Sequence, residues 1–81
     1  MTAQTDTDDA FSKMFARMLD ADFRLAVKRH ENRAYSMEDN ECRNYKALTR
    51  EFEQAAIEAG ISIADAHAEV RQRLLERAAA W

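Results

Sequence analysis

Apolar side chains recur along most of the chain at the spacing of an α-helix. Three stripes can be followed, each on one helical face. They contain Phe11, Met14, Phe15, Met18, Leu25 and Ala26 in the first, Tyr45, Leu48, Phe52, Ala55 and Ala59 in the second, and Ile63, Ala66, Val70, Leu74 and Trp81 in the third. The pattern predicts three helices, over about 8–32, 37–59 and 63–80.

The start of the chain shows no such periodicity. Residues 1–7 are polar, and we expect them to form an N-terminal tail. Thr7, followed by two aspartates, resembles a helix start, since the acids suit the positive end of the helix dipole. Ser36, with Asp39 three residues later, is predicted to cap the second helix.

The strongest local signal lies between the second and third helices. Gly60 is placed to end the second helix in the left-handed conformation, with Ile61 as its hydrophobic follower. Ser62 and Asp65 have the spacing of a capping box for the third helix. The short connection predicts an all-α, up-down-up, three-helix bundle that occupies 8–81 as a single domain.

Composition limits the functions available. The 81 residues include one glycine, no proline and sixteen alanines. A phosphate-binding P-loop, a dinucleotide fingerprint and a nucleophile elbow each need two or three glycines, so none can be built here. The few large apolar residues suffice for one small core, which homodimerisation would enlarge.

No pattern indicates catalysis or metal binding. Residues three before His30 and His67 are Val27 and Ala64, so the Glu-x-x-His motif of di-iron bundles is absent. Cys42 is the one cysteine and cannot form an internal disulfide. We therefore expect no enzyme activity, cofactor or metal. The acidic start and the lack of a long apolar run predict a cytoplasmic protein without a membrane segment.

Three polar residues fall on apolar faces, namely Asp22, His67 and Arg77. If the first and third helices run parallel, Asp22 lies level with Arg77 and could pair with it across the bundle. Alternatively, Asp20–Asp22 breaks the first helix, or Asp22 belongs to a site open to a partner. His67 is expected to be a half-buried packing residue with a satisfied nitrogen.

Charge is segregated along the chain. Basic residues dominate 23–35, whereas 1–22 and 36–60 are net acidic. The basic side of the first helix and the acidic start of the second are our candidates for partner binding: Arg17, Arg24 and Lys28, with Glu38, Asp39 and Glu41.

These features favour a non-enzymatic protein-binding module, a small regulator, inhibitor or adaptor that occupies a surface of a larger protein. Adaptors, antitoxin-like regulators and inhibitors encoded by phages or mobile elements share this format. The alternative is DNA binding, because residues 54–74 have the layout of a helix-turn-helix. Asp65 and Glu69 on its second helix would repel phosphate, so nucleic acid is the less favoured partner.

Overall fold

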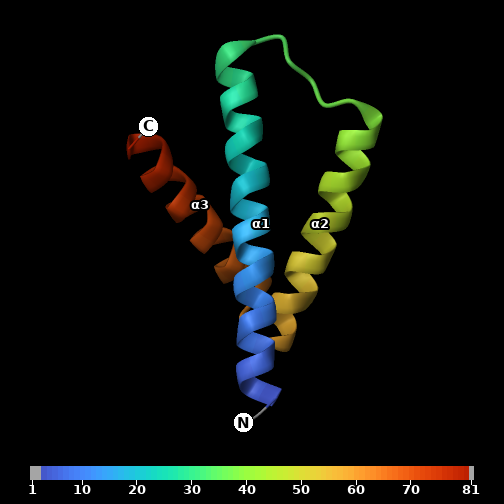
Figure 1. Cartoon of the computed structure of the whole chain (residues 1–81), viewed down its shortest axis with the longest axis vertical. Coiled ribbons are helices and arrows are strands. Elements are labelled where there is room, and N and C mark those ends of the chain that lie inside the picture. The colour runs from blue at the N-terminus through green and yellow to red at the C-terminus, as the bar shows by residue number, and fades with distance from the viewer. Residues whose placement is uncertain (1–2, 81) are drawn as a thin grey trace.

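The computed structural model describes residues 3–80, with side chains from residue 9 onward. This part of the chain forms three α-helices, α1 (Ala3–Glu31), α2 (Asp39–Glu58) and α3 (Ile63–Ala80). Figure 1 shows α1 running the length of the molecule, α2 returning beside it and α3 turning back again. The predicted all-α, up-down-up, three-helix arrangement is confirmed.

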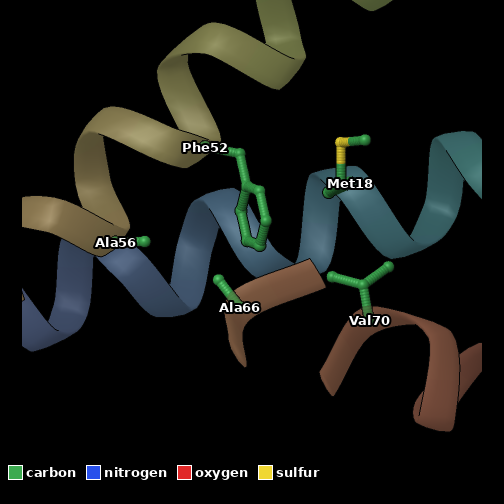
Figure 2. Close-up of a cluster of buried hydrophobic side chains, with 5 residues drawn as sticks. All are labelled: Met18, Phe52, Ala56, Ala66 and Val70. Atoms are coloured by element: carbon green, nitrogen blue, oxygen red, sulfur yellow. The ribbon is translucent and has the colours of Figure 1, made fainter. Parts of the chain in front are cut away.

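The core lies where the three helices meet, around one phenylalanine ring. Phe52 of α2 has no exposed surface, and Met18 of α1 and Val70 of α3 are each 2% exposed. Figure 2 shows the Phe52 ring pointing away from α2 into the space shared with α1 and α3, beside Ala66. Alanines complete the interior, so the helix backbones approach closely at this end.

Aromatic side chains of α1 extend this core. The Phe11 ring stacks on Phe52 with centroids 5.6 Å apart, and the Phe15 ring lies tilted 6.3 Å from it. Such offset and tilted pairs add to the free energy gained from area burial alone.

Two residues of the predicted apolar stripes are not buried in the structure. Ala26 is exposed, and Ile63 is 39% exposed. Trp81 lies outside the described residues.

The first helix differs from the prediction at two places. It begins at Ala3 rather than at residue 8, so residues 3–7 of the predicted tail are helical. It also runs without interruption through Asp20–Asp22, so the alternative of a break there is wrong. Ala21 between the two aspartates is a strong helix former, and the packed residue Met18 lies in the preceding turn.

The second helix starts later than predicted. Its N-cap is Glu38, not Ser36, and the Glu41 carboxylate accepts a hydrogen bond from the Glu38 backbone N–H at 3.3 Å. The predicted capping box, Ser36 with Asp39, is of the right type but lies two residues before the observed one, Glu38 with Glu41. The cause is tertiary, because Glu41 is also held by groups from α1 and from the preceding loop.

The turn between α2 and α3 confirms the sequence prediction. Gly60 adopts a φ of 77°, and its N–H donates to the Ile57 carbonyl while the Ile61 N–H donates to Ala56. This is the Schellman pattern that satisfies the last carbonyls of a helix. The Ser62 hydroxyl accepts from the Asp65 N–H at 3.1 Å, as predicted for a cap.

Away from the core the helices splay apart, as Figure 1 shows. The radius of gyration is 14.0 Å, against about 12 Å for a compact domain of this length. The solvent-accessible area is 6029 Å², against about 5,000 Å² for a compact monomer of the same mass. The chain therefore leaves surface exposed that a closed bundle would bury.

Because one ring fills the junction, its removal should be costly. We expect Phe52→Ala to lower the free energy of unfolding by about 3–5 kcal/mol, measured by urea titration with circular dichroism. Leu75→Ala is the control, since Leu75 is 61% exposed, and it should change stability by less than about 0.5 kcal/mol. Equal losses for the two variants would contradict the described core.

Candidate functional site

An open groove of about 240 Å³ lies between α1 and α2 at the splayed end. Its apolar lining comes from both helices and from the loop that joins them. The groove is lined by Ala21, Arg24, Leu25, Lys28, Met37, Glu41, Asn44, Tyr45 and Leu48. The arrangement offers apolar side chains with a few charged groups around them, a layout common to binding sites.

A polar cluster, formed by Lys28, Tyr35 and Glu41, ties the two helices together beside the groove. The Lys28 ammonium donates to the Glu41 carboxylate at 2.9 Å, and the Tyr35 hydroxyl donates to the other carboxylate oxygen. The Lys28 nitrogen also lies 5.4 Å from the centre of the Tyr35 ring. The cluster thus joins the end of α1, the loop and the start of α2.

The cluster changes the titration of its members. Hydrogen bonds from Tyr35 and Lys28, in that order of importance, lower the pKa of Glu41 to about 2 from an ordinary value of 4.5. The hydrogen bond to Glu41 raises the pKa of Lys28 and that of Tyr35. Glu41 is therefore ionised throughout the neutral range and carries the charge that the Lys28 ammonium binds.

The structure brings some of the predicted partner-binding residues together and separates others. Lys28 and Glu41, predicted to lie on two separate patches, form an ion pair with each other. Arg24 lies with them around the groove. Arg17, Glu38 and Asp39 are exposed and do not line it. Three of the six predicted residues, Arg24, Lys28 and Glu41, thus meet at one groove, and the other three lie outside it.

Asp22 does not pair with Arg77, so the predicted cross-bundle pair is wrong. The Asp22 carboxylate accepts a hydrogen bond from the Tyr45 hydroxyl of α2. Burial and this hydrogen bond raise the pKa of Tyr45 well above its ordinary value of 10.0. The bond gives Asp22 a partner on an otherwise apolar stripe, just below the groove.

Arg77 pairs instead with the neighbouring Asp20, with 2.8 Å between nitrogen and oxygen. Its guanidinium also lies 4.5 Å from the centre of the Phe23 ring. The parallel arrangement of α1 and α3 was predicted correctly, but the pairing was assigned to the wrong aspartate. Asp20 is on the side of α1 that faces α3, whereas Asp22 faces α2.

His67 is half-buried, as predicted. Its Nε2 lies 2.7 Å from the Glu53 carboxylate of α2, and its ring meets the Phe52 ring edge-on at 5.4 Å. One nitrogen is therefore satisfied while the ring packs on the core. This arrangement explains a histidine on an apolar face without any ligand.

Residues that the sequence did not single out complete the site. Tyr35 and Asn44 were not recognised, since no periodicity extends through the loop and Asn44 is an isolated amide on a polar face. Met37 lies in the same loop and also lines the groove with its flexible side chain. The Cys42 thiol lies 3.9 Å from the Met37 sulfur.

A second groove, of about 630 Å³, lies between the N-terminal half of α1 and α3. Its apolar part consists of Phe11, Phe15 and Ile61, which also pack against the core. Asp65 and Glu69 of α3 are exposed along its side. The two grooves therefore differ in charge, since this one carries acids and the first carries Arg24 and Lys28.

Residues 3–80 contain no group of three or more His, Cys, Asp or Glu side chains placed to hold a metal ion. None of the three helices, over the same residues, combines the length and apolar character required to cross a bilayer. No protein-family model, curated protein or solved structure matches this chain.

The sign of the Glu41 shift predicts how stability depends on pH. A carboxylate whose pKa is lower in the folded state stabilises the fold above its unfolded pKa and loses this effect as the pH falls. We expect Glu41→Gln to reduce the urea midpoint at pH 7. The difference from the wild type should shrink between pH 4.5 and about 2. Glu51→Gln, at an exposed position of α2, is the control and should show no such pH dependence.

The pairing of Asp22 is testable by two double-mutant cycles. Asp22→Ala and Tyr45→Phe should each cost about 1 kcal/mol of unfolding free energy, and the double variant little more than one of them. Asp22→Ala combined with Arg77→Ala should give additive losses, because these side chains bind different partners. Additivity in the first cycle and coupling in the second would restore the pairing predicted from the sequence.

Proposed function

We propose that the chain is a non-enzymatic protein-binding module that acts as a small regulator, inhibitor or adaptor. The observation that carries the proposal is the α1–α2 groove, whose apolar floor is left open by the splay of the helices. A monomer that exposes more surface than its mass requires has area available for a partner. The groove is small, so it suits one side chain of another protein rather than a free metabolite.

The charges around the groove indicate what that partner presents. Arg24 and Lys28 supply two positive charges, and Glu41 neutralises one through the Lys28 ion pair. The positive charge of Arg24 is then available to bind a carboxylate of the partner. The proposed occupant is therefore an apolar side chain that enters over Leu25 and Leu48, with an Asp or Glu nearby on the same segment.

The DNA-binding alternative draws less support from the geometry. The turn at Gly60 is accounted for by the helix cap on one side and the Ser62 cap on the other. Asp65 and Glu69 are exposed on α3, the helix that would enter the major groove. Carboxylates at these positions repel the phosphate backbone.

The test is capture of a partner with a tagged chain from lysate of the native host, with and without nuclease. The wild type should recover one protein in stoichiometric amount after nuclease treatment. Arg24→Glu and Leu25→Lys should lose it, because they reverse the charge beside the groove and insert a charge into its floor. Circular dichroism checks that both variants are folded.

Arg73→Glu is the matched control, since it makes the same charge reversal on an exposed position of α3 and should retain the partner. Recovery of that protein at unchanged levels by both groove variants would contradict the proposal. Loss of recovery on nuclease treatment would favour the DNA-binding alternative.

A further inference from the structure

The α1–α3 groove, of about 630 Å³, joins aromatic side chains to a pair of exposed carboxylates. Phe11 and Phe15 line it from α1 and are only partly buried. The Phe11 ring stacks on Phe52, so the surface that it adds to the groove is the part of the ring away from the core. Asp65 and Glu69 line the groove from α3. The groove therefore combines aromatic surface with negative charge.

Within residues 9–80, no cation is bound to either carboxylate. None of the ion pairs in this part of the chain includes Asp65 or Glu69. Arg73, the cation one turn beyond Glu69 on α3, is exposed and is not joined to it by an ion pair. The Ser62 hydroxyl accepts from the backbone N–H of Asp65 and leaves its carboxylate unoccupied. Both negative charges are thus available to a cation from outside these residues.

The chain itself shows how a ring and a carboxylate together bind an arginine. The Arg77 guanidinium carbon lies 4.5 Å from the centre of the Phe23 ring, and one of its nitrogens lies 2.8 Å from the Asp20 carboxylate. An arginine suits both groups at once, because its planar guanidinium stacks on the ring while its edge donates to the carboxylate. A lysine ammonium is a compact charge and fits this combination less well.

The spacing of the two carboxylates sets the spacing of the arginines that fit them. Asp65 and Glu69 are four residues apart on α3, which corresponds to about 6 Å along its axis. Two arginines four residues apart on an incoming helix have the same separation, so each can bind one carboxylate. An apolar residue three positions after the first arginine lies in the adjoining row of that helix and would cover Phe11, Phe15 and Ile61.

We propose that the α1–α3 groove binds an amphipathic helix of another protein that carries two arginines one turn apart beside an apolar residue. The arginines donate to Asp65 and Glu69, and the apolar residue packs on Phe11 and Phe15. The α1–α2 groove shares no lining residue with this one and carries Arg24 and Lys28 instead. A chain with both grooves occupied joins two proteins, as an adaptor does, which goes beyond the single docking surface of the proposed function.

Binding of a designed peptide tests this second surface. The probe is a synthetic, alanine-rich helical peptide with two arginines four residues apart and a leucine three residues after the first. In an NMR titration of isotope-labelled protein, it should bind with a dissociation constant below about 1 mM and shift the amide signals of residues 11–15 and 65–72 most. The same peptide with glutamine in place of both arginines should bind about five- to tenfold more weakly, because two charge-assisted contacts are lost.

Neutral variants of the groove give the reciprocal test. Asp65→Asn/Glu69→Gln should weaken binding of the arginine peptide by about five- to tenfold and remove its advantage over the glutamine peptide. Glu51→Gln/Glu58→Gln is the matched control, since it makes the same change in net charge at two exposed positions of α2. It should leave the dissociation constant unchanged, and circular dichroism checks that both variants are folded.

Several results would overturn the proposal: no saturable binding of the arginine peptide, equal affinity for the two peptides, unchanged affinity in Asp65→Asn/Glu69→Gln, or signal shifts centred on Tyr45 and Leu48 of the other groove. Self-association of the chain alone in ultracentrifugation, lost in the same variant, would assign the groove to a second copy and overturn it too. Arg24→Glu, which tests the proposed function, should still bind the arginine peptide, so either proposal can fail without the other.

Discussion

The ring of Phe52 is fully buried at the point where α1, α2 and α3 meet, in contact with Phe11, Phe15 and His67. Around it the buried residues are Met18, Val70 and small alanines, and the alanines bury little area each. One side chain thus supplies much of the apolar contact between the three helices. Because that contact lies toward one end, the helices are free to diverge at the other.

Polar contacts hold the divergent end. Tyr45 and Asp22 join α2 to α1 above the core, and Lys28, Tyr35 and Glu41 join them again near the loop. Partly exposed contacts of this kind contribute less than burial does, and salt screens them. They fix the distance between the helices without closing the space, and the α1–α2 groove results.

The sequence predicted the fold because its strongest signals are local. Gly60 and Ser62 specify the turn by backbone conformation and capping, and the stripe through Phe52 specifies the buried face of α2. The boundaries at Ala3 and Glu38 were missed, since residues 3–7 have no apolar periodicity and the start of α2 depends on contacts between Glu41 and distant residues.

The candidate site was predicted only in part, for a related reason. Arg24, Lys28 and Glu41 were singled out by charge, but their meeting in one groove depends on how α1 and α2 cross. The partner of Arg77 illustrates the same point, since the sequence suggested Asp22 and the structure has Asp20. These aspartates are two residues apart, so they face different helices, and periodicity alone does not fix which neighbour each one meets.

Because the core lies toward one end, backbone amides in different parts of the molecule are expected to be protected from hydrogen exchange to different degrees. Amide hydrogens near Phe52 and Ala66 can exchange only when the whole bundle opens, whereas those from Arg24 to Glu41 need only a local separation of α1 and α2. The groove therefore belongs to a part of the fold that is expected to deform at lower cost than the junction at Phe52. Its width can adjust to the side chain that enters it while the junction at Phe52 stays unchanged.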